Sequence, residues 1–169
     1  MKPIFAQAKT APKRIAYAEG EDLRVLRAIQ IAVDEGLAQP ILVGRTAVIE
    51  ANIKKLGLRL EHGVNITIVD QEKNPDYDKF ADDYYNLMQR KGVTPEYAQR
   101  ETRRRSTLIA AMLVRHGLAD GMLCGTYASY DIHLDFVRNV IGLKEGRNNF
   151  FTLNALMLED RNIFIADTY

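Results

Sequence analysis

Short apolar runs and amphipathic stretches alternate along the first part of the chain. Residues 15–18, 40–44 and 64–69 are apolar runs of strand length. Between them, apolar residues recur at helical spacing over 23–33 and 46–56, and a glycine ends each of these stretches soon afterwards. This order of strand, helix, strand, helix and strand predicts an α/β fold, with a parallel sheet and helices on its faces.

The middle of the chain is mainly helical before one further strand. Thr94 and Pro95 are typical of a helix start, with the threonine as N-cap and the proline at the first helical position. Four other elements are expected in this order: a helix from 76 to about 91, a helix over 107–114, a buried strand over 120–125 and a helix over 131–141. Residues 126–130 form the loop between the last two.

The C-terminal part has a different pattern. Residues 144–149 are polar and contain a glycine, which is typical of a linker. The runs 150–158 and 163–166 resemble strands spaced like a hairpin. Two strands do not form a stable domain alone. We therefore expect a first α/β unit over 1–148 and the opening strands of a second, incomplete unit over 149–169, with the remainder truncated or on another polypeptide.

Composition narrows the functional classes. The 169 residues suffice for about one domain, and 23 basic against 22 acidic residues leave a net charge of +1. Such a neutral chain does not indicate a nucleic-acid or membrane partner. The single cysteine, Cys124, excludes an intrachain disulfide framework and fits a reducing compartment. No apolar stretch is long enough to span a bilayer, and the first residues do not resemble a signal peptide, so we expect a cytoplasmic location.

The strongest candidate binding residues follow the strand over 120–125. Gly125 permits close backbone approach, and Thr126, Ser129 and Tyr130 add hydroxyl groups just before a helix. Helix N-termini beyond the carboxyl ends of parallel strands attract phosphate. His133 lies just inside that helix and could be near a ligand. The spacing matches neither a Walker nor a dinucleotide motif, so the local pattern alone favours an ordinary strand-to-helix turn.

Other charged and reactive residues favour structural roles. The acidic turn over 19–22 could line the same cleft, but it would repel phosphate and fits a helix start better. The arginines at 103–105, with Arg100, could bind a phosphate or the acidic face of a partner, but a solvated loop between helices is the favoured interpretation. His62, His116 and His133 lack the spacing of a zinc site, and Cys124 has no adjacent base to activate it.

Several stretches, taken together, resemble a known family. Residues 14–26 resemble the opening strand and helix of phosphate acetyltransferases (phosphotransacetylases), and 40–44 resemble their second strand. Residues 91–94 and 119–125 resemble a helix boundary and the strand before the active-site loop. The whole chain is more similar still to the phosphotransacetylase-like domain at the C-terminal end of bacterial malic enzymes. The runs 1–14 and 164–169 are the stretches that resemble this domain.

The resemblance implies a three-layer αβα fold like that of phosphotransacetylases and isocitrate dehydrogenases, with two subdomains around a cleft. The family binds CoA and acetyl phosphate there, and its catalytic serine, arginine and aspartate belong to the second half. Two arginines of the first half correspond to Met88 and Asp135 here. Neither residue can neutralise a phosphate.

These departures imply a regulatory part of a malic enzyme that senses acetyl-CoA or a related acyl-CoA and holds no cofactor of its own. The parent enzyme would convert malate to pyruvate and CO2 with NADP and a divalent metal on other parts of the same polypeptide, as a homo-oligomer. Two alternatives stay open: part of a working phosphate acetyltransferase, and a non-catalytic oligomerisation module.

Overall fold

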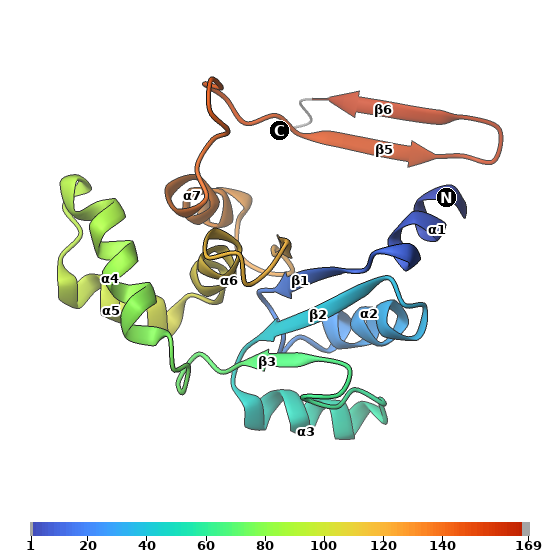
Figure 1. Cartoon of the computed structure of the whole chain (residues 1–169), viewed down its shortest axis with the longest axis horizontal. Coiled ribbons are helices and arrows are strands. Elements are labelled where there is room, and N and C mark those ends of the chain that lie inside the picture. Colours follow the sequence, from blue (N-terminus) through green and yellow to red (C-terminus); the bar gives the residue numbers. More distant parts are fainter. Residues whose placement is uncertain (1, 167–169) are drawn as a thin grey trace.

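The computed structural model of the chain describes residues 2–166 (Figure 1). The family resemblance at residue 1 and at 167–169 lies outside the described residues. The secondary structure follows the predicted alternation, with one additional helix at the start, α1 (Lys2–Thr10). No helix within 2–166 combines the length and the apolar character needed to cross a membrane.

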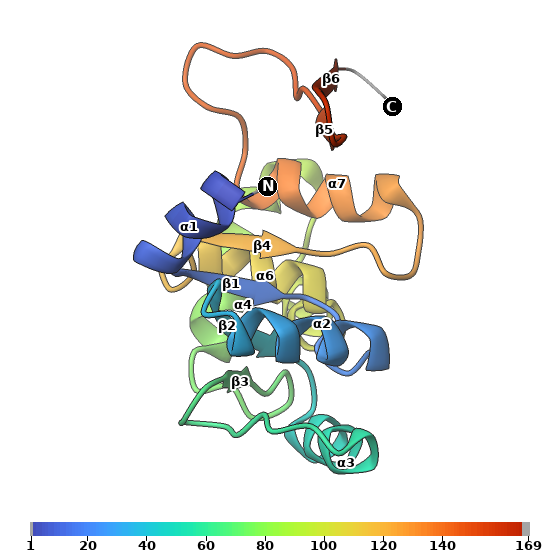
Figure 2. The same cartoon turned by 90° about the vertical axis from the view of Figure 1, so that its right-hand side faces the viewer.

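Four parallel strands form the main sheet. They are β1 (Lys13–Tyr17), β2 (Ala38–Val43), β3 (Thr67–Val69) and β4 (Gly121–Leu123), in the spatial order β3-β2-β1-β4. The chain runs outward from β1 to β2 and β3, then returns to the other side of β1 with β4 (Figure 2). The sheet confirms the predicted α/β class, and it reverses its strand order between β1 and β4.

Helices cover both faces of this sheet. The helices α2 (Leu23–Asp34) and α3 (Thr46–Leu56) pack on one face, while α4 (Tyr77–Met88), α5 (Pro95–Arg104), α6 (Ser106–Arg115) and α7 (Tyr130–Val140) form the other layer. Strand β2 shows why: Leu42 lies in the apolar cluster with α2 and α3, whereas Ile41 and Val43 lie in the cluster with α4 to α7. Because successive side chains of a strand point to opposite faces, a continuously apolar strand supplies both cores.

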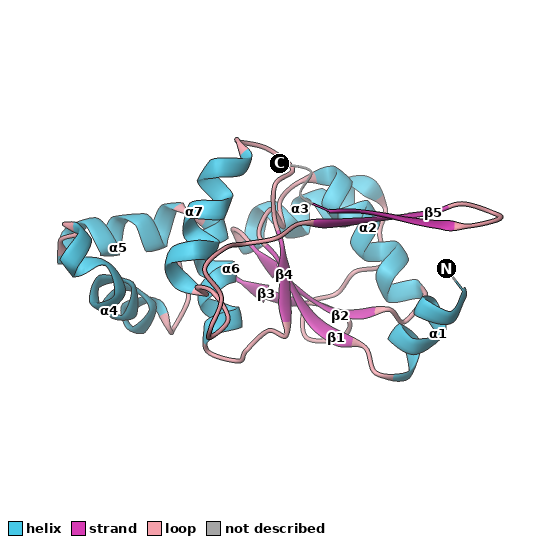
Figure 3. Ribbon diagram, turned by 90° about the horizontal axis from the view of Figure 1, so that it is seen from above, coloured by secondary structure: helices cyan, strands magenta, loops and turns pink. Residues whose placement is uncertain are grey.

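The helices α4 and α5 lie side by side at the end of the molecule away from α1 (Figure 3). A 3-10 turn, Gln89–Lys91, follows α4, and α5 begins as expected, with the Thr94 hydroxyl accepting from the Tyr97 amide at 3.2 Å. The predicted loop at 103–105 is wrong, because α5 continues to Arg104. The side chain of Arg103 contacts an aromatic ring, because its guanidinium lies 4.3 Å from the centre of the Tyr77 ring.

The predicted strand over 64–69 is shortened to β3, because its first half forms a turn. The Gly63 amide donates to the carbonyl of Ile66, and the side chain of Asn65 bonds the Glu61 amide and the Arg59 carbonyl. Asparagine side chains that bond nearby backbone groups compete with strand pairing in this way. The other predicted elements differ from the observed bounds by a few residues at most.

The two C-terminal strands, β5 (Leu153–Met157) and β6 (Asn162–Ala166), pair antiparallel as a hairpin and form a sheet of their own. The hairpin lies beyond α7, apart from the main sheet (Figures 1 and 2). Its apolar side chains are exposed, and Phe164 keeps 63% of its surface accessible.

Candidate functional site at the switch point of the sheet

The reversal of strand order brings two distant loops together. The acidic turn over 18–22 follows β1, and the loop over 124–129 follows β4. The amide of Ala18 donates to the Leu123 carbonyl at 3.0 Å, and the amide of Gly125 donates to Oε1 of Glu19 at 3.0 Å. Ligands of open α/β sheets bind beyond the carboxyl ends of the strands at such a switch point.

The acidic turn is largely neutralised by its own neighbours. The Asp22 carboxylate caps α2, accepting from the Arg24 amide at 2.7 Å and from the Val25 amide at 3.4 Å. Hydrogen bonds from the Arg24 side chain, with those backbone bonds, lower the pKa of Asp22 to about 2. Hydrogen bonds from Arg45 likewise lower the pKa of Glu21, whose carboxylate lies 2.8 Å from the Arg45 guanidinium. The turn is therefore both a helix start and a lining of the cleft.

The loop after β4 is held at three consecutive residues. In addition to the bond of the Gly125 amide, the Thr126 carbonyl accepts from Nη2 of Arg24 at 3.2 Å, and the Tyr127 carbonyl lies 2.7 Å from Nε2 of His133. The backbone is thus anchored from α2, from the acidic turn and from α7. Its side chains are exposed, so the loop presents its hydroxyl groups to solvent on a fixed backbone.

This conformation uses two residues in the left-handed region. Gly125 has φ +107°, where a side chain would be strained, and Ala128 has φ +67°. Ala128 is the only residue other than glycine with positive φ among residues 2–166. Left-handed backbone at a non-glycine residue persists where surrounding contacts hold it.

The predicted site residues lie together but differ in what they can offer. Thr126 and Ser129 are exposed, and Ser129 occupies the N-cap position of α7 without a side-chain capping bond. Tyr130 is the first residue of α7 and is 43% exposed. The amide of Gly125 is already used by Glu19. His133 is only 7% exposed, with both ring nitrogens bonded inside the chain.

A pocket of about 260 Å³ opens at this switch point. Its lining comes from several parts of the chain. The acidic turn and the end of β2 contribute, as do Arg104 and Ser106 at the junction of α5 and α6, and Tyr127 in the loop. The sequence offered the arginine run as a possible phosphate-binding cluster but favoured a solvated loop, because such runs between helices are usually solvated, and it gave no signal for Ser106. Only the tertiary fold shows that this junction faces the cleft.

Arg104 differs from the neighbouring arginines in having no internal partner. Arg100 lies 4.9 Å from the centre of the Tyr97 ring, Arg103 stacks over Tyr77, and Arg105 pairs with Glu101 at 2.9 Å. Within residues 2–166 the Arg104 guanidinium makes no hydrogen bond or ion pair, and it lines the pocket. It is therefore a cationic group that the fold leaves available at the switch point.

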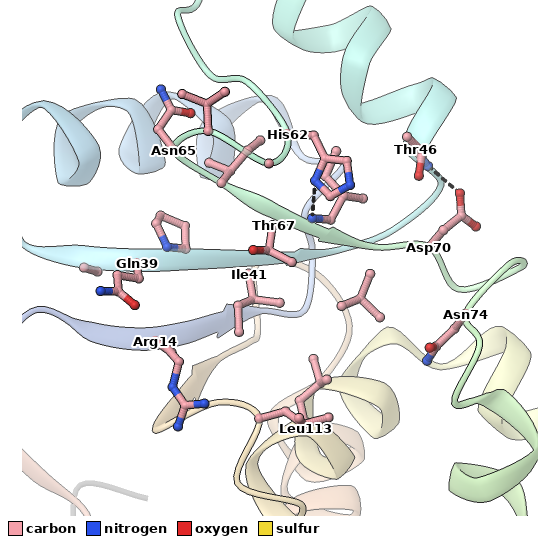
Figure 4. Close-up of a pocket in the computed structure, with 18 of the residues that line it drawn as sticks. Arg14, Gln39, Ile41, Thr46, His62, Asn65, Thr67, Asp70, Asn74 and Leu113 are labelled. Atoms are coloured by element: carbon pink, nitrogen blue, oxygen red, sulfur yellow. Dashed lines mark hydrogen bonds between the residues drawn. The ribbon is translucent and has the colours of Figure 1, made fainter.

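A larger cavity, about 900 Å³, lies elsewhere, along the edge strand β3 (Figure 4). Several of its polar side chains are paired within the chain. The Asp70 carboxylate accepts from the Thr46 amide at 2.9 Å, Nδ1 of His62 accepts from the Ile68 amide at 3.0 Å, and Arg14 pairs with Asp120. Specific sites need convergent unpaired polar groups, so the smaller pocket at the switch point is the better candidate.

Two further observations concern the chemistry of the site. Burial, with a smaller effect of the Glu19 carboxylate, raises the pKa of the Cys124 thiol, which favours the unreactive protonated form. No group of three or more His, Cys, Asp or Glu side chains that could hold a metal occurs among residues 2–166.

The resemblance led us to expect Met88 and Asp135 at the positions of two family arginines. Met88 is 7% exposed and packs in the apolar core, while Asp135 lies exposed on α7. Neither side chain supplies a positive charge to the cleft.

The chain is similar to two groups of known proteins. The chain is 48% identical over all 169 residues to an NADP-dependent malic enzyme of Haemophilus influenzae and to one of Escherichia coli, and it spans 22% of the length of each. It is also 32% identical over 133 residues to a phosphate acetyltransferase of Thermoanaerobacterium thermosaccharolyticum, covering 78% of this chain and 39% of that one.

Among solved structures, a phosphotransacetylase from Streptococcus pyogenes superimposes with a TM-score of 0.83 at 26% identity, over 97% of this chain and 50% of that one. The family model described as "Phosphate acetyl/butaryl transferase" matches residues 1–169. The chain belongs to the phosphate acetyl/butaryl transferase family, in which it is similar to the C-terminal region of NADP-dependent malic enzymes.

Proposed function

We propose that this chain is the phosphotransacetylase-like regulatory region of a malic enzyme, and that it binds acetyl-CoA as an effector that restrains malate oxidation. The identity to malic enzymes over the whole chain supports the assignment to that enzyme. The observation that carries the binding role is the preorganised pocket at the switch point, with Arg104 as its uncommitted cation.

The residues of the pocket define how acetyl-CoA fits. A volume of about 260 Å³ is too small for a whole CoA molecule, so one end enters and the rest lies over the exposed loop. Its phosphate binds near Arg104 in this proposal, because Glu21 and Asp22 elsewhere in the lining are acidic and repel it. The hydroxyls of Thr126 and Ser129 supply neutral hydrogen bonds at the rim.

The oxidation itself belongs to other parts of the enzyme. NADP and a divalent metal supply the hydride transfer and the activation of malate there, in a homo-oligomer whose remaining polypeptide is a partner of this chain. The residues of this chain bind the effector and hold the loop over 125–130 in place. Acetyl-CoA therefore acts at a distance, by preferring one of two states of the enzyme.

The test is an acetyl-CoA titration of malate oxidation by the full-length malic enzyme that contains this chain. Arg104→Gln should weaken the response about tenfold or more, because a charge-assisted hydrogen bond contributes about 1.5–3 kcal/mol. Arg103→Gln is the matched control: it removes the same charge one residue away, where the side chain stacks on Tyr77. It should change the response by less than about twofold.

Two outcomes contradict the proposal. A wild-type enzyme that neither binds nor responds to acetyl-CoA would show that the chain is no acetyl-CoA sensor. Unchanged inhibition in the Arg104→Gln variant, and in a variant combining Ser129→Ala with Tyr130→Phe, would place the effector elsewhere on the enzyme.

A further inference from the structure

His133 connects two segments that line the switch-point pocket, the loop after β4 and the start of α6. Its Nε2 lies 2.7 Å from the carbonyl oxygen of Tyr127, and its Nδ1 lies 2.9 Å from the hydroxyl of Thr107. Tyr127 lines the pocket on the loop side, and Thr107 directly follows Ser106, which lines it on the α6 side. The imidazole thus links the loop after β4 to the start of α6 by two hydrogen bonds.

The partners define the state of the ring. A carbonyl oxygen can only accept a hydrogen bond, so Nε2 carries a proton. In the neutral ring Nδ1 then accepts from the Thr107 hydroxyl. His133 is 7% exposed and Thr107 is 5% exposed, so water cannot replace the bond between them cheaply, whereas the bond to the Tyr127 carbonyl is partly buried.

We infer that His133 is a positioning residue: it sets the width of the switch-point pocket and thereby the affinity for the anionic ligand. This inference rests on the proposed function. Ala128, next to Tyr127, has φ +67°, so the loop holds a backbone conformation that needs support. The bond from Nε2 to the Tyr127 carbonyl supplies it one residue away. Without that bond, Tyr127 and the exposed hydroxyls beside it are no longer held at a fixed distance from Arg104 and Ser106.

A pair of near-isosteric substitutions separates positioning from general stability. The terminal amide of glutamine reaches the place of Nε2, so His133→Gln keeps a donor for the Tyr127 carbonyl and loses the bond to Thr107. The shorter amide of asparagine reaches the place of Nδ1, so His133→Asn keeps the bond to Thr107 and loses the one to Tyr127. His133→Gln gives up the buried bond and His133→Asn the partly buried one, so the asparagine variant should lose no more thermal stability than the glutamine variant.

Acetyl-CoA affinity should nevertheless differ between them. We expect His133→Asn in the full-length enzyme to bind acetyl-CoA about tenfold more weakly, and His133→Gln to stay within about threefold of wild type, measured by calorimetry. Hydrogen exchange of the amides over 126–129 should accelerate in the asparagine variant and not in the glutamine variant. Thr107→Ser, which keeps the hydroxyl, is the control for the α6 side.

The outcomes distinguish this inference from the proposed function. Wild-type protein without acetyl-CoA affinity contradicts the proposed function itself. Wild-type affinity together with equal losses in the two His133 variants, following their thermal stability, overturns the positioning role. If His133→Asn fails to fold, Thr107→Val provides the second comparison, because it removes the same bond as His133→Gln and keeps the one to Tyr127. A tenfold loss of acetyl-CoA affinity or faster loop exchange in Thr107→Val, relative to Thr107→Ser, then overturns the assignment to the Tyr127 bond.

Discussion

Asp22 supports the site in two ways, as the N-cap of α2 and as the ion-pair partner of Arg24. Removing its carboxylate should therefore lower the free energy of unfolding measurably. The residue caps α2 and pairs with Arg24 at 2.8 Å, and Arg24 in turn bonds the Thr126 carbonyl. Loss of an N-cap side chain costs about 1 kcal/mol, and a partly exposed ion pair contributes at most about 1 kcal/mol more. Asp22→Ala should therefore lower the free energy of unfolding by about 1–2 kcal/mol, equivalent to about 3–6 °C in Tm for a chain of this length.

The assay is urea unfolding of the 169-residue chain at pH 7. Asp22→Asn is the control, because asparagine caps helices as well as aspartate and loses only the charge. It should cost less than about half as much as the alanine variant. A loss below about 0.3 kcal/mol in Asp22→Ala, or equal losses in both variants, would refute the role of the cap.

The contribution of Asp22 should also depend on pH. The pKa of Asp22 in the folded chain is about 2, below its ordinary value of 3.8, so the folded state favours the ionised form. The stabilisation is then fully present above about pH 4 and declines as the pH falls toward 2. The difference between wild type and Asp22→Ala should be smaller at pH 3 than at pH 7; an undiminished difference would contradict the assignment of the low pKa to this contact.

Three further predictions concern activity, backbone strain and the hairpin. The purified chain should not acetylate CoA from acetyl phosphate in a thiol-consumption assay, because Met88 and Asp135 supply no cation to the cleft; clear turnover would contradict this. Gly125→Ala should lower the free energy of unfolding by about 1–3 kcal/mol in the same urea assay, because the residue has φ +107°. Gly121→Ala is the control: the backbone there is extended and the new Cβ would lie 3.6 Å from Ile15, so it should cost less than about 1 kcal/mol. Phe164→Asp should reduce self-association of the chain in sedimentation without lowering Tm, because this exposed ring supports no core contact; unchanged association would remove the hairpin from consideration.

Hydrophobic periodicity predicted the sheet and its helices because these elements bury continuous apolar faces. The N-cap at Thr94 and the glycine that ends α3 were also predictable, since both depend on local backbone chemistry. The loop over 125–130 was predictable as a candidate site from its place between a strand and a helix, although the strand, expected to be buried, is the edge strand β4, in which Leu123 is 57% exposed. These features need only neighbouring residues for their explanation.

The predictions that the structure corrects were wrong because longer-range or competing interactions decide these segments. Alternating apolar residues over 64–69 predicted a full strand, but the side chain of Asn65 bonds Glu61 and Arg59 and turns the chain. The arginine run predicted a loop, yet stacking of Arg103 on a tyrosine of α4 keeps that segment helical. Pattern alone does not contain the packing partner, so it cannot weigh a tertiary contact against solvation.

The charge of the site shows why the ligand contact itself was not predictable. Counted along the sequence, the turn over 19–22 carries three carboxylates and opposes any phosphate. In the structure, Arg24 and Arg45 pair with two of them, and the amide of Gly125 bonds the third. Coulomb interactions within a few ångströms dominate over more distant charges, so the unpaired guanidinium of Arg104 decides what a ligand meets at the rim of the pocket. An anion is therefore favoured near Arg104, although the sequence that lines the pocket contains several acidic residues. A variant that lacks Arg24 or Arg45 should bind the anion more weakly. The reason is that a carboxylate of the acidic turn loses its cationic partner, not that the anion loses a direct contact.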